Sequence, residues 1–215
     1  AKQNSQKAEY KLANGRIAQL ANDDALSQAE WLIALDIGNQ DNAATDNIYL
    51  ACELPSALFE QELAAFITAQ PHLYWPKNHD ALIAQTRNMI GKLCISEAPL
   101  TSVTKADISQ CAGDYIQAQG LHILPWDDDS RNLQARLHFL HQRQAHINSE
   151  FTWPDCSDSN LMATIDVWLG PYLGDVCHKN HLKKIPLREI LLNQLDWSQQ
   201  QALAKLAPER LHVPS

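Results

Sequence analysis

The 215-residue sequence lacks the motifs with which nucleotide-driven motors hold their substrate. It contains no Gly-x-x-x-x-Gly-Lys-Ser/Thr loop, whose backbone amides would cradle phosphates, and no Asp-Glu-Ala-His box to hold magnesium. No serine or cysteine stands in a Gly-x-Ser-x-Gly elbow or an equivalent nucleophile pattern. The sequence therefore predicts that this chain is not itself an enzyme.

Positive charge is also scarce. Lysine and arginine number 17 against 25 aspartates and glutamates, which gives a formal net charge of −8, and neither half of the chain is basic. A domain that binds nucleic acid by itself usually carries a basic face. We therefore expect any contact with nucleic acid to be local and weak.

Two further absences bear on the compartment. The 5 cysteines are odd in number and widely spaced, which favours reduced thiols over a disulfide framework. No apolar run approaches the roughly 18 residues of a membrane-spanning helix, and no secretory signal is present. The sequence predicts a cytoplasmic protein with no membrane partner.

The first half of the sequence carries a mostly β pattern, in which short apolar runs are separated by glycine or polar clusters. One helix interrupts the series over 55–69. About five strands with one helix inserted before the fourth suit a small barrel of the OB type, plugged at one end by the helix. The expected strands are 10–20, 30–37, 47–52, 72–75 and 82–95, the last bent near 88–91. The expected buried stripe of the helix is Leu58, Phe59, Leu63, Phe66 and Ile67.

Helical signals begin near residue 99. Thr104 with Asp107 makes a capping-box-like start, and Gly120 can close the helix that follows. Acidic residues at 127–129 favour the dipole of the next helix. Further helices are expected at 158–169, 186–195 and 198–206, and a terminal strand at 210–213.

These patterns divide the chain into three parts. Residues 1–8 are polar and indicate a linker. Residues 9–98 are expected to form the OB-type barrel with its inserted helix, and residues 99–215 a small, mostly α-helical domain. The predicted fold class is α+β, because sheet and helices lie in separate stretches of sequence.

A Trp-Pro-Asp-Cys-Ser-Asp segment leads into the helix expected at 158–169. Ser157 or Asp158 can cap the free amides of the first helical turn. The tryptophan is expected to anchor the loop in the core. A structural role is predicted for Trp126, Trp153, Pro154, Asp155, Ser157 and Asp158.

A Trp-Pro-Asp-x-Ser-Asp element before such a helix resembles the C-terminal region of the bacterial HrpB-type DEAH-box ATP-dependent helicases. Three other short matches occur in the family's order and span nearly the whole chain. Four matches in register make the resemblance specific, although each is short. The other three are Leu-Ala-Asn-Gly-Arg at 12–16 with Trp-Leu-Ile at 31–33, Leu-Pro-Trp at 124–126 with Ala-Arg at 135–136, and Leu-Ala-Pro at 206–208 with Pro-Ser at 214–215.

The resemblance implies a non-catalytic piece of an ATP-dependent RNA helicase. The family carries the nucleotide motifs in two motor domains upstream, so ATP and magnesium would belong to those domains, and no cofactor is expected here. The implied partners are the motor domains in cis, RNA bound weakly, and a regulatory protein on the OB-type domain. In the family a glycine and a further tail follow the last residues matched here.

Five residues are predicted to contact RNA. Aromatic rings beside basic side chains are what an OB fold uses to stack bases and follow phosphates. Two alternatives stay open: one of Tyr74 and Trp75 must point inward, because the two alternate in a strand, and Arg16 can pair with a local acid. Gly15 is expected to serve the backbone through a bulge or a tight bend. The predicted RNA contacts are Arg16, Trp75, Lys77, Arg87 and Lys92.

Two histidine groups were weighed as metal sites. Asp175, Cys177, His178 and His181 lie within seven residues, but no second Cys or His pair stands at zinc-finger spacing. His138 and His141 share a helical face, yet no glutamate completes a His-Glu-x-x-His site. We expect residues 175–181 to form a polar connecting loop and the helix face with His138 and His141 to be solvated. No metal site is predicted.

Two other classes of function remain as alternatives. One is an interaction or scaffold module of the helicase that never touches RNA, which the acidic balance favours. The other is a small enzyme with a histidine-based metal site. Salt-dependent RNA binding tests the first, since phosphate contacts weaken as salt rises, and metal content tests the second.

Overall fold

The computed structural model describes residues 1–3, 8–38, 45–144 and 151–209. The chain divides into two compact units. The first, here the β unit, comprises Ala1–His72 and Gln85–Leu100. The second, the helical unit, comprises Leu73–Ala84 and Thr101–Ser215, so that a short piece from the β-rich half joins the helices.

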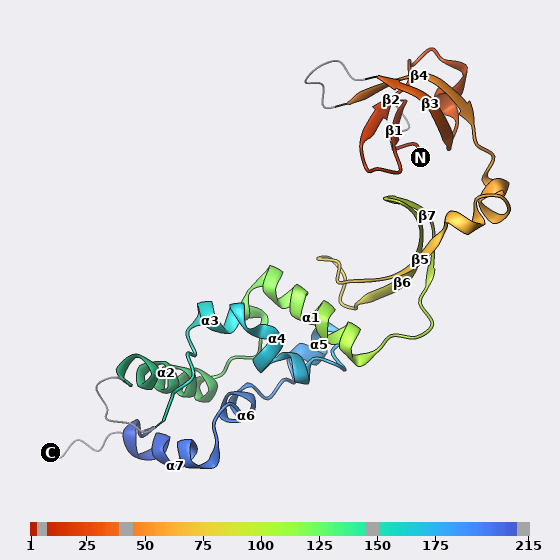
Figure 1. Cartoon of the computed structure of the whole chain (residues 1–215). Helices are drawn as coiled ribbons and strands as arrows, with labels where there is room; N and C mark the ends of the chain where they lie inside the picture. The colour runs from red at the N-terminus through yellow and green to blue at the C-terminus, as the bar shows by residue number, and fades with distance from the viewer. Residues whose placement is uncertain (4–7, 39–44, 145–150, 210–215) are drawn as a thin grey trace. The chain divides into compact units, whose positions relative to one another are not determined.

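Sheet A of the β unit has four strands in the order β1-β2-β4-β3 (Figure 1). The pairs β1–β2 and β3–β4 are antiparallel, whereas β2 and β4 run parallel. The edge strand β3 carries an irregularity between Ala34 and Asp36. The strands are β1 (Glu9–Lys11), β2 (Ile17–Gln19), β3 (Leu32–Gly38) and β4 (Asp46–Glu53).

The single strand expected over 10–20 is instead the hairpin of β1 and β2. Gly15 lies in the connecting turn with φ +90°, and its amide donates to the Leu12 carbonyl (2.9 Å). Asn14 Oδ1 accepts from the Arg16 amide (2.9 Å). An Asn-Gly pair of this kind favours a tight hairpin turn, which is why one expected strand is two.

Sheet B has three strands in the order β5-β6-β7. The last expected strand, 82–95, is likewise a hairpin, turned at Gly91 with φ +57°. A Cβ at Gly91 would collide with the Ala13 carbonyl oxygen, and the Lys92 amide donates to that same oxygen (2.8 Å). The strands are β5 (Thr68–Tyr74), β6 (Ile83–Ile90) and β7 (Leu93–Pro99).

The described residues form two sheets and no closed barrel, so the predicted barrel is not confirmed. The helix expected over 55–69 is replaced by two short 3-10 segments, η2 (Ser56–Glu60) and η3 (Ala64–Phe66). Phe59 is buried, but Phe66 is 65% exposed, so the predicted buried stripe is wrong at that end. A third segment of this kind, η1 (Ala25–Gln28), is capped by Asp24.

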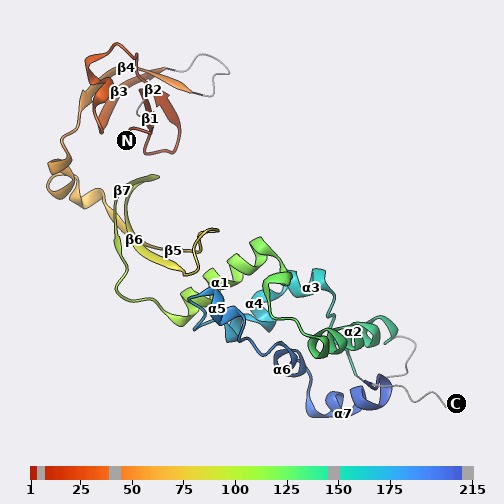
Figure 2. The same cartoon turned by 180° about the vertical axis from the view of Figure 1, so that it is seen from behind.

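The helical unit contains seven α-helices in the described residues, and α2, α6 and α7 pack together in both views (Figures 1 and 2). The helices are α1 (Lys105–Gln119), α2 (Asp128–Arg143), α3 (Asp158–Ala163), α4 (Ile165–Trp168), α5 (Lys179–Leu182), α6 (Leu187–Leu192) and α7 (Trp197–Leu206). Two 3-10 turns join them, η4 (Leu121–Ile123) and η5 (Gly170–Tyr172).

Helices α1 and α2 begin where the sequence predicted a helix start. Thr104 and Asp107 form a reciprocal capping box at α1, and Gly120 ends that helix with φ +100°. Asp127 caps α2 through the Ser130 amide (2.8 Å). Because these signals join residues three or four apart, the sequence alone locates them.

Two elements differ from expectation, and a third expected element cannot be compared. The helix expected over 158–169 is two helices, broken at Thr164, whose hydroxyl donates back to the Asn160 carbonyl (2.7 Å). A hydroxyl bonded in this way often bends a helix. Helix α5 lies where a loop was expected, and the strand expected at 210–213 lies outside the described residues.

Each unit has its own core. In the helical unit one continuous cluster runs from Trp75 through α1, α2 and the later helices to Ala207. The cluster in the β unit is small, with Tyr10 and Ile48 among its members. The Tyr10 hydroxyl reaches the carbonyls of Leu26 (3.0 Å), Ser27 (3.3 Å) and Ala29 (2.9 Å), which ties sheet A to η1.

Candidate nucleic-acid interface

Arg16 lies at the start of β2 and pairs with Asp46, whose side chain is 4% exposed. Asp46 is one of the few buried charged groups, and a buried carboxylate without a partner would be costly. The local-acid alternative for Arg16 is therefore what the structure shows. The arginine side chain keeps 55% of its surface exposed.

Trp75 belongs to the helical unit and is 8% exposed. Its ring stacks on Tyr115 of α1 with centroids 4.7 Å apart and planes 22° apart, and its indole N–H donates to the His79 carbonyl (3.3 Å). Of the alternating pair, Trp75 is the ring that points inward. The structure places it in the core, with little surface left on which a base could stack.

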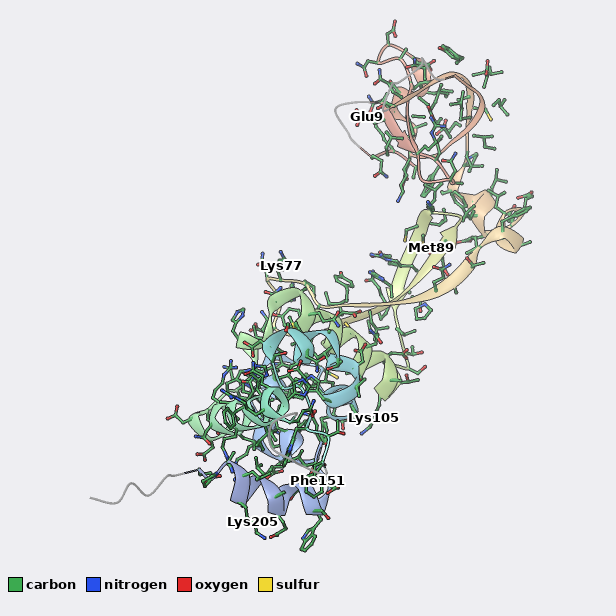
Figure 3. All side chains as sticks on the ribbon, turned by 60° about the vertical axis from the view of Figure 1, so that its left-hand side comes forward. Glu9, Lys77, Met89, Lys105, Phe151 and Lys205 are labelled. Carbon is green, nitrogen blue, oxygen red and sulfur yellow. The ribbon has the colours of Figure 1, made fainter. Side chains whose placement is uncertain are left out.

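Lys77 follows on the exposed loop between β5 and β6 (Figure 3). Its carbonyl accepts from Lys179 Nζ (3.3 Å), so the loop is held against α5. No ion pair of the Lys77 ammonium occurs within the described residues. Among the five predicted RNA contacts, Lys77 is the basic residue that belongs to the helical unit.

Arg87 and Lys92 lie in and after β6 in the β unit. Arg87 is cross-strand from Glu97 and pairs with it (2.7 Å), which leaves a third of the arginine side chain exposed. Lys92 is exposed and crosses the turn at Gly15, where a Cβ would approach Lys92 Cδ to 2.6 Å. Gly15 thus leaves room for the lysine stem, as well as adopting a left-handed backbone conformation.

The five predicted contacts therefore fall into two groups. Arg16, Arg87 and Lys92 belong to the β unit, while Trp75 and Lys77 belong to the helical unit. The structure brings the Lys92 stem against the turn that leads to Arg16, and it ties Lys77 to α5.

The Trp-Pro-Asp loop is built as a helix entrance. Trp153 is 1% exposed, and Pro154 follows it in the turn toward α3. Asp155 Oδ1 accepts from the Ser157 amide (2.9 Å), and Ser157 Oγ accepts from the Asn160 amide (3.3 Å). The hydrogen bond from the Ser157 amide is the main cause that lowers the pKa of Asp155.

One face of α2 holds this loop. Gln134 Nε2 donates to the Cys156 carbonyl (2.9 Å) and to Asp158 Oδ1 (2.7 Å). His138 Nδ1 lies 3.2 Å from Asp155 Oδ1, and His141 Nδ1 lies 2.8 Å from the Trp153 carbonyl oxygen. The solvated histidine face expected here is thus wrong: both histidines bind a loop that sequence spacing alone could not connect to α2.

Trp126 has a related role at the start of α2. Its indole N–H donates to the Leu121 carbonyl (2.8 Å), and the Arg131 guanidinium lies 3.9 Å from the ring centroid. Arg131 also reaches Asp158 Oδ1 (3.4 Å). These contacts join the two diagnostic tryptophan segments through α2.

The His178 and His181 rings lie 6.1 Å apart, and each ring already has a backbone partner. His178 Nδ1 accepts from the Asn180 amide (3.1 Å), and His181 Nδ1 lies 3.0 Å from the Asp175 carbonyl oxygen. Within the described ranges no group of three His, Cys, Asp or Glu side chains could hold a metal ion.

Two further features are the state of the cysteines and the length of the helices. The five cysteines are free thiols, and burial raises the pKa of Cys111 to about 11 and that of Cys156 to about 12. In the part of the chain that the structure describes, no helix is long and apolar enough to cross a bilayer.

Sequence reasoning missed one concentration of charge. From residue 176 to residue 188 the chain carries three lysines, an arginine and two histidines without any Asp or Glu. The lysines of this segment are Lys179, Lys183 and Lys184. A count of charge in short windows would have found it.

The comparisons with known proteins indicate the class of this chain, which is the C-terminal domain of an ATP-dependent helicase. Residues 168–215 match the family model described as "ATP-dependent helicase C-terminal". The chain is 31% identical over 216 residues to the "ATP-dependent RNA helicase HrpB" of Escherichia coli (strain K12), an alignment that covers 100% of this chain and 26% of that protein.

A solved structure gives the same result. The "Crystal structure of E. coli DExH-box NTPase HrpB" matches 97% of this chain and 25% of that chain, with 29% sequence identity and a TM-score of 0.50. The chain therefore corresponds to the C-terminal region of HrpB-type helicases. It spans about a quarter of the length of the relatives that it matches.

Proposed function

We propose that this chain is a non-catalytic accessory region of a cytoplasmic, DEAH-box, ATP-dependent RNA helicase. Motor domains of the same polypeptide would bind ATP and magnesium, and this region would help to form the RNA path beside them. The observation that carries the proposal is the similarity to E. coli HrpB along the whole of this chain, joined to the lack of nucleotide motifs in it.

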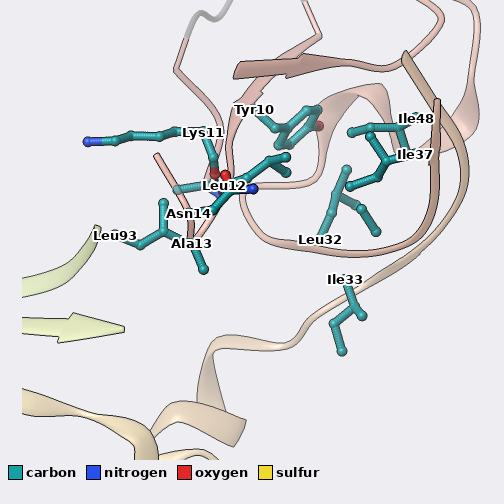
Figure 4. A pocket seen from close by; sticks show the side chains of 12 residues that line it. Tyr10, Lys11, Leu12, Ala13, Asn14, Leu32, Ile33, Ile37, Ile48 and Leu93 are labelled. Atoms are coloured by element: carbon teal, nitrogen blue, oxygen red, sulfur yellow. Dashed lines mark hydrogen bonds between the residues drawn. The ribbon is translucent and has the colours of Figure 1, made fainter. Parts of the chain in front are cut away.

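We further propose that the β unit is an OB-type domain whose two sheets face a shared apolar interior. An apolar hollow of about 440 Å³ supports this, since residues of both sheets line it. Figure 4 shows Tyr10, Leu32 and Ile48 around it from sheet A, and Leu93 from β7. Two sheets around one interior are how a small, partly open barrel is built.

The RNA contacts in the β unit are proposed to centre on Lys92 and Arg87. Lys92 is exposed, and Arg87 keeps part of its guanidinium accessible beside Glu97. Arg16 is proposed as a secondary contact, because its exposed side chain also neutralises Asp46.

Salt-dependent RNA binding tests this proposal. A short single-stranded oligouridylate should bind the 215-residue chain at about 50 mM salt and bind it at least ~10-fold more weakly at about 200 mM, because phosphate contacts release counterions. The Arg87→Ala/Lys92→Ala variant should bind more weakly and with a shallower salt dependence. Absence of binding by the unaltered chain even at low salt would overturn the proposal.

A second candidate is an interaction module that does not contact RNA. Two observations favour it: the net charge of −8, and an exposed apolar group on β3 and β4. Leu35 and Tyr49 are each 63% exposed, and Leu50 is 56% exposed. This surface would suit a regulatory protein or another part of the helicase. Absence of RNA binding by the unaltered chain in the test above would favour this second candidate.

A further inference from the structure

The helical unit carries a basic surface in an otherwise acidic chain. Its core is the segment from residue 176 to residue 188, which contains no Asp or Glu. Lys183 and Lys184 are exposed there, and within the described residues neither ammonium has an ion-pair partner. Two unpaired lysines next to one another are available to a ligand.

The packing of α5 turns these lysines outward. Leu182 and Ile185, which flank the pair, are 3% and 8% exposed and belong to the helical core. Lys183 continues the helical turn, with φ −67° and ψ −14°. Since Lys179 lies four residues earlier, it shares a side of that turn with Lys183.

A second segment, about a hundred residues earlier in sequence, is fixed beside α5. The Lys179 amide donates to the Asp80 carbonyl (2.8 Å), and the Leu82 amide donates to the Cys177 carbonyl (3.0 Å). Lys179 Nζ reaches the Lys77 carbonyl (3.3 Å) and Asp80 Oδ1 (3.2 Å). The exposed loop that carries Lys77 is thereby held against the start of α5, at Lys179.

The charge balance of this surface is positive. Asp80 is the carboxylate paired to it, and it faces Lys179. Lys77, Lys183 and Lys184 remain without such a partner in the described part of the chain. Surplus charge of one sign attracts an anion of repeating charge, such as a phosphate backbone or an acidic peptide.

An aromatic hollow beside Lys77 favours a nucleic-acid strand over an acidic peptide as the ligand. Its volume is about 220 Å³, and Tyr74, Trp75, Lys77 and Tyr115 help to line it. Asp114 and Gln119 of α1 add hydrogen-bonding groups to the lining. Aromatic side chains next to a basic groove are how single-stranded nucleic acid is held, since bases stack while cations follow phosphates.

We propose that Lys77, Lys179, Lys183 and Lys184 form a second RNA-binding surface, on the helical unit, which holds phosphates of a single strand while one base enters the hollow beside Tyr115. The inference rests on the proposed function, because it assigns a further part of the RNA path. It differs in the residues that it requires, none of which lies in the β unit.

The test compares two charge-reversal variants of the full chain. Lys183→Glu/Lys184→Glu alters the proposed surface, and Arg143→Glu/Lys205→Glu is the matched control, since it changes net charge equally at exposed positions of α2 and α7. Binding of a short oligouridylate is measured at about 50 and about 200 mM salt. Binding of inorganic polyphosphate is measured beside it.

The proposal predicts that Lys183→Glu/Lys184→Glu weakens oligouridylate binding by at least ~10-fold and makes the salt dependence shallower by about one unit, while the control changes binding less than ~3-fold. The unaltered chain should prefer oligouridylate to polyphosphate. Tyr115→Leu should reduce that preference.

Three results would overturn it. Equal loss of oligouridylate binding in both charge-reversal variants would mean that only net charge matters. Equal affinity of the unaltered chain for oligouridylate and polyphosphate would mean that no base is bound in the hollow. Unchanged binding by Lys183→Glu/Lys184→Glu, together with loss in Arg87→Ala/Lys92→Ala, would confine the RNA path to the β unit. That last pattern leaves the proposed function standing, whereas no binding by the unaltered chain removes both.

Discussion

The helical unit and the β unit of this chain depend on different kinds of interaction. Helices of the helical unit start at side-chain caps and close around one continuous core, in which Trp153 and Leu137 are fully buried. The β unit buries few residues, and its sheets depend on pairing between distant strands, such as β2 with β4. We conclude that the helical unit is the better stabilised of the two.

The largest expected effect comes from the core of the helical unit. Trp153→Ala should lower the free energy of unfolding by about 3–5 kcal/mol, because it removes a fully buried aromatic side chain and leaves a cavity. Chemical denaturation followed by helical circular dichroism measures the change. Trp197→Ala is the matched control, since Trp197 is 74% exposed and its loss should cost under about 0.5 kcal/mol.

An intermediate effect is expected in the β unit. Tyr10→Phe should lower the free energy of unfolding of that unit by about 1–3 kcal/mol, because carbonyls of the η1 segment lose their donor. Native-state hydrogen exchange read at sheet A separates this unit from the helices. Equal destabilisation of α2 would contradict the comparison, since it would mean that the two units unfold together.

The smallest effect concerns the loop that α2 holds. Asp155→Asn should lower the stability of the helical unit by about 1 kcal/mol or less at neutral pH, since Asp155 and His138 are each about one-third exposed. Because the pKa of Asp155 is lowered by folding, its contribution is present above the ordinary value of 3.8 and disappears as the pH falls through the lower folded value.

Denaturation across pH checks that sign. Wild type and Asp155→Asn should differ at neutral pH and converge in acid below 3.8. A difference that grew as the pH fell would contradict the role given to the carboxylate. Ser159→Ala, a change in the first turn of α3 next to the cap, serves as the control.

Local signals were predicted well. The cap at Thr104, the acidic start of α2 at 127–129 and the glycine end at Gly120 follow from spacings of a few residues. The strands over 30–37 and 47–52 were also found, within one or two residues, as β3 and β4. The segments 10–20 and 82–95 were each predicted as one strand, the second with a bend near 88–91, whereas both are hairpins with turns at Gly15 and Gly91.

The candidate sites were harder to predict. Sequence named Trp75 beside Lys77 but could not decide that the ring packs on Tyr115, forty residues later. It placed His138 and His141 on one face of a helix without revealing that the Trp-Pro-Asp loop covers that face. Nor did it connect Lys77 to α5, because a contact between segments a hundred residues apart leaves no periodic signal in either.

The sequence by itself determined where helices such as α1 and α2 start and that the chain carries no nucleotide motif, since both are properties of short segments. It also carried the motifs that mark an HrpB-type C-terminal region. Tertiary structure alone decided which aromatic ring is buried, which arginine is neutralised by Asp46, and which lysines lie together. The physical reason is that burial and charge pairing depend on what the rest of the chain places beside a residue.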